Sequence, residues 1–419
     1  MNGTRLAAGR FGLGYDQTMS RQILLTLAII LGLTGSSCAD TRDAVARGKY
    51  LATLGDCAGC HTNGGGPQYI GGLPFIAAFG TLYSSNITPD KETGIGNWTA
   101  DQFYQALHTG VTASGKHLYP AFPFIYFTHV TRPDSDAIYA YLRTVKPVHS
   151  IPPANKLIFP FNIRMMMVFW DTMFFDAGTF RAEPSKSAEW NRGSYIVNGF
   201  GHCAACHTPK NLLFGDEKSK ALAGGTQEDW FSANLNGNMR GGLGKWSEAD
   251  IVQYLKTGRN RYAAAAGSMQ EKVTSSTSHM SDSDLMAIAI YLKSLAPIPQ
   301  RTPPSPDTRA MQAGGDIFVA SCSACHLEPG AGDPRDYPDL AGDTLIMGRD
   351  PGTVVRIVLQ GAQSAKTPNA SPGYSMPGFA ALTEQNIADV TTYIRNAWGN
   401  RASPVLPKNV KALRETLAD

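Results

Sequence analysis

Three segments of the chain repeat one arrangement of apolar and polar positions. In each segment apolar residues fall at positions i, i+3, i+4 and i+7, and position i+3 is a tyrosine. The three sets are Ile138, Tyr141, Leu142, Val145; Ile288, Tyr291, Leu292, Leu295; and Val390, Tyr393, Ile394, Ala397. This spacing puts the four side chains on one face of an α-helix, so we predict three amphipathic helices. Ser281 and Thr383 precede the second and third helices and are the expected N-caps.

Prolines gather between these segments and mark the expected domain boundaries. Residues 146–160 contain four prolines and residues 296–306 contain five. Proline cannot continue a helix, and such runs favour extended linkers. The repeat is too long for a solenoid, so we predict three tandem domains, mainly α-helical and rich in loops. The expected divisions are an N-terminal extension and signal peptide at 1–39, domain 1 at 42–148, an apolar linker segment at 149–186, domain 2 at 187–297, a Pro-rich linker at 298–307, domain 3 at 308–400 and a C-terminal tail at 401–419.

Composition agrees with several small, loop-rich domains. The chain has 419 residues, and an apolar fraction of 43% is sufficient for two or three cores. Its 43 glycines and 26 prolines make up about one residue in six, above the usual level of roughly one in eight. The net charge of +3 favours no particular partner, and no nucleic-acid partner is expected.

The pentapeptide Cys-x-x-Cys-His occurs once before each amphipathic segment. Two thiols at this spacing can bond to the two vinyl groups of one porphyrin, and the adjacent imidazole can bind the iron. Structural zinc, the alternative, normally needs two Cys pairs a short distance apart, whereas these pairs are separated by 146 and 119 residues. We therefore predict three covalently bound haems c, numbered 1 to 3 along the chain. Their attachment and proximal-ligand residues are Cys57, Cys60 and His61, then Cys203, Cys206 and His207, then Cys322, Cys325 and His326.

Each iron also needs a second axial ligand, which in electron-carrying cytochromes is commonly methionine. Met376 lies 17 residues before Tyr393, and Met269 lies 22 residues before Tyr291 in a loop rich in glycine and alanine. We expect them to be the distal ligands of haems 3 and 2. Met280, the alternative for haem 2, adjoins the helix cap and is expected to serve packing.

Domain 1 departs from this pattern at Phe122, which lies 19 residues before Tyr141 where a methionine is expected. A phenyl ring cannot bind iron. Either another group serves or the position is vacant, so haem 1 is expected to have a lower potential than the others or to be partly high-spin. The candidate ligands are His117, His129, Met165, Met166, Met167 and Met173.

The N-terminus has the features of an export signal. Met19, Ser20 and Arg21 give a short basic start, residues 23–33 are uncharged and apolar, and cleavage is expected after Ala39. Translation from Met19 instead of Met1 is an alternative start. Cys38 is expected to leave with the signal peptide, with lipid attachment as the alternative. Together with the haem motifs, this places the protein on the periplasmic side of the bacterial cytoplasmic membrane.

Two further apolar segments suggest contacts. Residues 157–175 form the most apolar internal stretch, which we expect to lie at the membrane interface, against a partner subunit or in an interdomain core. Val410, Leu413 and Leu417 give the C-terminus a short apolar face that suits a docking tail.

Residues 42–405 resemble the three-haem cytochrome c subunits of bacterial membrane-bound dehydrogenases acting on alcohols, gluconate, sorbitol or aldehydes. The likeness rests on the haem motifs and on residues 47–51, 117–121, 201–209 and 374–377. It implies three class I cytochrome c domains that relay electrons from a partner dehydrogenase to membrane ubiquinone or a terminal oxidase, with peripheral membrane contact. The chain is then a subunit and no enzyme by itself. Phe122 is more like the branch that accompanies molybdenum hydroxylases of aldehydes or N-heterocycles.

A haem enzyme of the peroxidase type, acting at haem 1, is the alternative function. Phe122 keeps this alternative open because it leaves haem 1 without its expected methionine. A peroxidase also needs acid and base groups over the iron, and the sequence places none there.

Overall fold

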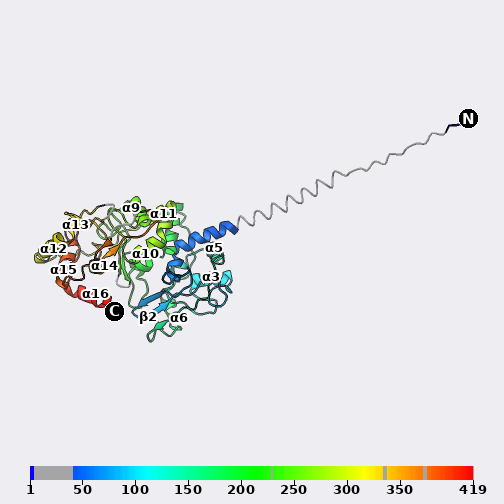
Figure 1. Cartoon of the computed structure of the whole chain (residues 1–419), viewed down its shortest axis with the longest axis horizontal. Helices are drawn as coiled ribbons and strands as arrows, with labels where there is room; N and C mark the ends of the chain where they lie inside the picture. Colours follow the sequence, from blue (N-terminus) through cyan, green and yellow to red (C-terminus); the bar gives the residue numbers. More distant parts are fainter. Residues whose placement is uncertain (4–40, 228–229, 334–336, 371–374, 419) are drawn as a thin grey trace.

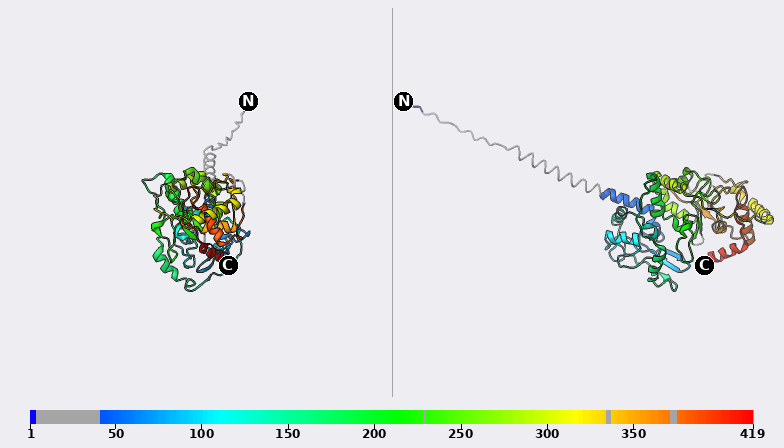
Figure 2. Two further views of the ribbon diagram at one scale, coloured as in Figure 1. Left: turned by 90° about the vertical axis from the view of Figure 1, so that its left-hand side faces the viewer. Right: turned by 180° about the vertical axis from the view of Figure 1, so that it is seen from behind.

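The computed structural model describes residues 1–3, 41–227, 230–333, 337–370 and 375–418 (Figure 1). The expected signal peptide, with Met19 and Cys38, lies outside the described residues. Three helical units follow one another along the molecule, and the predicted mainly α-helical, loop-rich architecture is confirmed (Figure 2).

Domains 1 and 2 share one plan: a first helix, the haem-motif helix, a two-stranded hairpin, a middle helix and a last helix. In domain 1, residues 41–54 are helical and precede α2 (Cys57–His61), β1 (Pro74–Ala77), β2 (Gly80–Tyr83), α3 (Ala100–Thr109), α4 (Phe124–Phe127) and α5 (Arg132–Leu142). Domain 2 contains α7 (Ala188–Tyr195), the π-helical turn η1 (Ile196–Phe200), α8 (Ala204–His207), η2 (Lys218–Lys220), β4 (Gly225–Gln227), β5 (Trp230–Ser232), α9 (Glu248–Thr257), α10 (Ser268–Ser275), η3 (Thr277–His279) and α11 (Asp282–Lys293).

Domain 3 repeats the plan and adds a helix at its C-terminal end. Its elements are α12 (Thr308–Ser321), α13 (Ser323–His326), α14 (Gly352–Gln360), β6 (Ala362–Gln363), β7 (Ser375–Met376), α15 (Glu384–Ile394) and α16 (Pro407–Ala418). The apolar face expected at the C-terminus docks on domain 3 itself, since Val410 and Leu413 of α16 are buried in its core.

The three predicted amphipathic helices are α5, α11 and α15. Ser281 and Thr383 cap α11 and α15 by accepting hydrogen bonds from the amides of Asp284 and Asn386, which confirms the predicted N-caps. The predicted stripes are one residue too long, because Val145, Leu295 and Ala397 lie just after the last helical residue. There the chain turns toward the linkers, and each of these amides donates within a turn, to Leu142 O, Leu292 O and Tyr393 O respectively.

A glycine marks the point where the first helix of each domain crosses the last. A Cβ atom on Gly48, Gly193 or Gly314 would lie only 1.8, 1.9 or 2.2 Å from a carbonyl oxygen of α5, α11 or α15. The same Cβ would lie 2.7–2.9 Å from the Cβ of Tyr141, Tyr291 or Tyr393. The helices therefore touch backbone to backbone, and the predicted tyrosines pack beside the contact.

Domains 1 and 2 are joined by a reciprocal exchange of tyrosines. Arg47 donates to Asp134 within domain 1, and Tyr195 of domain 2 donates to the same carboxylate at 2.7 Å. Arg192 donates to Asp284 within domain 2, and Tyr50 of domain 1 donates to that carboxylate, also at 2.7 Å. In each domain the buried carboxylate thus accepts hydrogen bonds from the arginine of its own Arg-Gly-x-Tyr sequence and from the tyrosine of the other domain's sequence.

Domain 3 joins domain 2 through a different contact. The amide of Phe231 on β5 donates to Thr353 Oγ1 at 2.6 Å, and that hydroxyl donates back to Phe231 O at 3.1 Å. The Phe231 ring also packs closely on Gly348. Domain 2 is therefore the central unit, in contact with both others.

The apolar linker between domains 1 and 2 contains β3 (Lys156–Leu157), which pairs with β2, and α6 (Met166–Phe174). Met167 and Trp170 are buried against Phe124 of domain 1, and Trp170 Nε1 donates to Leu213 O of domain 2 at 2.8 Å. Several other apolar side chains of the segment are exposed, among them Phe159, Met165, Phe169 and Met173. The segment is thus part interdomain core and part surface. None of the described helices has the length and hydropathy of a membrane span.

Candidate haem sites

Each Cys-x-x-Cys-His motif forms a short helix whose histidine is held by a backbone carbonyl. The Nδ1 atoms of His61, His207 and His326 lie 2.7, 2.6 and 3.3 Å from the carbonyl oxygens of Ser85, Ala233 and Pro338. With Nδ1 donating to the carbonyl, Nε2 of each ring is left with its lone pair for a metal. Burial lowers the pKa of all three imidazoles, against the opposing effect of the carbonyl, and so favours the neutral ligating form.

In the described part of the chain, the cysteines of the three motifs do not gather in the four-ligand sets that structural zinc uses. Burial raises the pKa of Cys57 to about 12 and the pKa values of Cys60, Cys203 and Cys322 to about 11, so these side chains are neutral thiols. Within the described ranges, no three side chains of His, Cys, Asp or Glu gather as a metal site. The zinc alternative therefore has no support.

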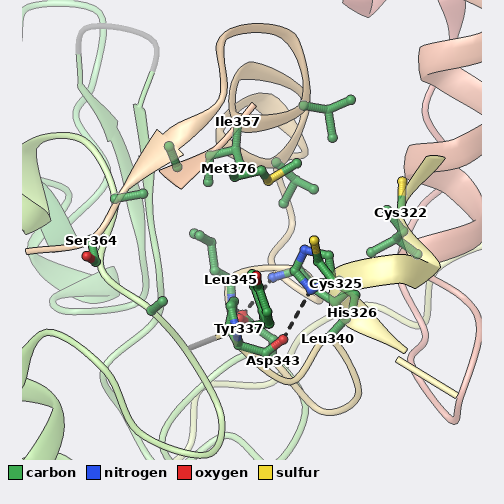
Figure 3. Close-up of a pocket in the computed structure, with 18 of the residues that line it drawn as sticks. Cys322, Cys325, His326, Tyr337, Leu340, Asp343, Leu345, Ile357, Ser364 and Met376 are labelled. Carbon is green, nitrogen blue, oxygen red and sulfur yellow. Dashed lines mark hydrogen bonds between the residues drawn. The ribbon is translucent and has the colours of Figure 1, made fainter. Parts of the chain in front are cut away.

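Domain 3 contains a cavity that fits a flat apolar group (Figure 3). Cys322, Cys325 and His326 lie on one side of it, and Met376 lies across it from His326. Most of the wall is aliphatic, including Leu340, Ile346, Val354, Ile357, Val358, Leu382, Val390 and Ile394. Thiols, imidazole and thioether thus surround one apolar space, as a covalent haem with two axial ligands requires.

The wall of this cavity also contains one buried carboxyl group. Burial raises the pKa of Asp343 to about 7, although the amides of Ile346 and Leu345 donate to Oδ1 and oppose the shift. Residues 257–260 and 264–266 of domain 2 complete the wall. The site of haem 3 is therefore built from two domains, which the sequence alone did not indicate.

The two methionines considered for haem 2 lie in different surroundings, and Met269 packs against Ala265, Val273 and Ala365. Met280 is buried in the core of domains 1 and 2 beside the cap of α11, whereas Met269 is half-buried at the start of α10. Gly267, two residues earlier, has φ of 55°, and a Cβ there would lie 2.6 Å from the ring of Trp230. Only glycine permits this approach of the loop.

The first and second haem motifs meet back to back. Asp56 and His202, the residues just before Cys57 and Cys203, both have positive φ. Lys272 of α10 lies between them, with Nζ 4.0 Å from Asp56 Oδ2 and 3.4 Å from His202 Nε2. Burial lowers the pKa of His202 well below its usual value, with Lys272 adding to the shift, so this imidazole is neutral. Lys272 thus places a positive charge between the haem attachment sites of domains 1 and 2.

Comparison with known proteins agrees with this geometry. The family model described as Cytochrome c matches residues 45–146, 192–296 and 311–398. The chain belongs to the cytochrome c family. With three such domains and one Cys-x-x-Cys-His motif in each, this cytochrome carries three covalently bound haems c.

Three relatives show the kind of cytochrome that the chain is similar to. The cytochrome c subunit of the quinone alcohol dehydrogenase of Gluconacetobacter polyoxogenes is 38% identical and covers 92% of this chain and 88% of its own length. The gluconate 2-dehydrogenase cytochrome c subunit of Pantoea cypripedii is also 38% identical, over 93% of this chain and 94% of its own length. A nicotinate dehydrogenase subunit of Pseudomonas putida is 41% identical over 85% of this chain, which spans 31% of that protein. The peroxidase alternative finds no support among these relatives.

Proposed function

We propose that this cytochrome is the electron-transfer subunit of a dehydrogenase complex, passing electrons singly through its three haems to ubiquinone or a terminal oxidase. The proposal rests on the contacts that join the three haem sites to one another. Lys272 contacts the residues that precede both Cys57 and Cys203, and domain 2 forms part of the haem 3 wall. Haems held in adjoining sites allow electrons to pass along the chain, while the redox chemistry belongs to the iron.

The proposal assigns one haem to each domain. Six cysteines would form the thioether bonds, His61, His207 and His326 would bind iron on the proximal side, and Met269 and Met376 would bind it on the distal side of haems 2 and 3. The fixed Nδ1 atoms support the proximal assignment. The position of Met376 across the cavity from His326 supports the distal one in domain 3.

Two classes of partner dehydrogenase are candidates. Similarity to the nicotinate dehydrogenase subunit favours a molybdenum hydroxylase of N-heterocycles or aldehydes. Similarity to the alcohol and gluconate dehydrogenase subunits over nearly their whole length favours an alcohol or sugar dehydrogenase. The two classes of partner differ in their cofactor, which is molybdopterin in the first class and quinone or flavin in the second. Identification of the partner's cofactor would therefore distinguish the two classes.

Contact with the periplasmic membrane face is part of the proposal. We call Phe159, Met165, Phe169, Met173 and Leu212 the apolar platform; Phe159, Phe169 and Leu212 are 77%, 63% and 98% exposed. Rings of Phe79, Phe161 and Phe214 pack with centroids 5.2–6.2 Å apart and hold the contributing segments together. Helix α6 and strand β2 lie on the same side of the molecule (Figure 1). Exposed apolar side chains of this kind suit insertion among lipid headgroups.

Purification of the tagged cytochrome from membranes of the producing organism with a mild detergent tests the proposal. We expect a dehydrogenase subunit to accompany it, and one member of a panel of N-heterocycles, aldehydes, alcohols and sugar acids to reduce the haems. A short-chain ubiquinone should then reoxidise them. Haems that dithionite reduces but that stay oxidised with every substrate would contradict the relay.

A further inference from the structure

The distal loops of domains 1 and 2 share the same hydrogen-bonded plan, although they differ in length by one residue. Helices α3 and α9 both begin with a capping box and end at a glycine with positive φ, Gly110 and Gly258. The loop that follows returns to the carbonyl of this glycine, through Leu118 N in domain 1 and Ala265 N in domain 2, each at 2.7 Å. Four residues after these amides stand Phe122 and Met269. Phe122 therefore takes the place of the proposed iron ligand of haem 2.

The phenyl ring of Phe122 separates the core of domain 1 from the linker helix. It packs against Phe127 with ring centroids 5.5 Å apart, and it contacts both the main core and the small cluster of Phe124, Met167 and Trp170. The ring offers no lone pair to a metal. The ring therefore fills this side of the haem 1 site without supplying an iron ligand.

The methionines of the linker are directed elsewhere. Met165, Met166 and Met173 are exposed on the surface of the molecule. Met167 is buried, but it belongs with Phe124 and Trp170 to a cluster separate from the domain 1 core that Cys57 packs against. Phe122 packs against both clusters.

The histidines near this loop are held by other groups. His117 Nδ1 lies 2.8 Å from Asp171 Oδ2, which turns the ring toward α6. His129 Nδ1 lies 2.9 Å from Gly178 O of the linker, and His108 Nδ1 lies 2.9 Å from Thr128 O. These bonds engage Nδ1 and hold the three rings on α6, the linker and Thr128, and Phe122 stands where domain 2 has Met269.

We propose that haem 1 has no protein ligand opposite His61, and that this vacant position binds small neutral molecules such as carbon monoxide beside the ring of Phe122. Haems 2 and 3, closed by Met269 and Met376, do not bind them. The inference rests on the proposed roles of these residues as iron ligands. It makes haem 1 the site of this cytochrome that is open to small molecules, and it gives that haem a weaker preference for the reduced state because methionine is absent.

The test is carbon monoxide binding to the purified, dithionite-reduced holoprotein, read from the absorbance difference spectrum. We expect one carbon monoxide per three haems in the wild type, and one high-spin haem in three by electron paramagnetic resonance of the oxidised protein. In Phe122→Met, a substitution of similar volume, carbon monoxide binding should fall to none and the high-spin signal should disappear. The variants Met167→Leu and His117→Asn are matched controls and should keep one carbon monoxide per chain.

Several results would overturn the inference. A wild type that binds no carbon monoxide and shows three low-spin haems would do so, and appearance of binding in Met167→Leu or His117→Asn would then name the ligand. Binding of two or three carbon monoxide molecules per chain would show that haem 1 does not differ from the other haems in its access to small molecules. These wild-type measurements stand even if Phe122→Met fails to fold. The haem count and reduction by the partner are independent of them, so the electron-relay proposal is tested separately.

Discussion

The crossing of α7 and α11 permits a sharp prediction about Gly193. In Gly193→Ala the new methyl group would lie 1.9 Å from the carbonyl oxygen of Ala287 and 2.8 Å from Cβ of Tyr291. Both are backbone or backbone-attached atoms, so the helices have to move apart. The displacement would reach Tyr291 and the neighbouring contact of Arg192 with Asp284.

The magnitude follows from two opposing effects. Forcing a methylene-sized group into a packed contact costs about 1–3 kcal/mol. Alanine in place of glycine inside a helix stabilises by up to about 1 kcal/mol. We therefore expect Gly193→Ala to lower the free energy of unfolding by roughly 0–2 kcal/mol, and by about 1–3 kcal/mol relative to a helical Gly→Ala variant that meets no such contact.

The matched control is Gly199→Ala in the same domain. A Cβ on Gly199 would lie 3.6 Å from its nearest neighbour, Cβ of His129, which is an ordinary contact. This variant should be as stable as the wild type or slightly more stable. Urea unfolding of the holoproteins, followed by tryptophan fluorescence, gives both values. Equal stability of Gly193→Ala and Gly199→Ala would refute the close crossing.

Three other predictions follow from the contacts between domains and at the surface. Asp284→Asn removes the acceptor of Arg192 and Tyr50 and should cost about 1–3 kcal/mol in urea unfolding at pH 7. Although burial opposes them, these two donors lower the pKa of Asp284, so its contribution is present at neutral pH and is lost progressively as pH falls below about 4; a difference from wild type that does not shrink between pH 5 and pH 3 would argue against this. Lys272→Met removes the cation between the first two motifs, which should lower the potentials of haems 1 and 2 by tens of millivolts and leave haem 3 unchanged in spectroelectrochemistry; equal shifts of all three would count against the contact. Phe159→Ser with Phe169→Ser should reduce sedimentation with anionic phospholipid vesicles several-fold while the buried Trp170 keeps the linker in place, and unchanged binding would exclude the apolar platform.

The sequence predicted the features that depend on local spacing. The helical period revealed α5, α11 and α15, and the Cys-x-x-Cys-His spacing revealed the haem motifs because attachment to one porphyrin needs neighbouring thiols. It overestimated the helices at Val145, Leu295 and Ala397, since each of these apolar residues continues the helical spacing although the chain has already entered a turn.

Features that depend on contacts distant in sequence were missed. The tyrosine exchange between Tyr50 and Asp284 joins residues 234 positions apart, and its only local signal is the Arg-Gly-x-Tyr sequence present in domains 1 and 2. The acceptors of the haem histidines are backbone carbonyls, which any residue provides. The linker at 149–186 was left with three open interpretations because one face of α6 is buried and the other is exposed, and a single apolar run does not separate them.

An anaerobic titration of the purified protein with a one-electron reductant tests the central claim most directly. Electrons taken up are counted against the absorbance of haem c until no further change occurs. The account predicts three electrons per chain, each matched by reduction of one covalently bound haem. Saturation at one or two electrons, with all three domains folded, would contradict a relay through three sites.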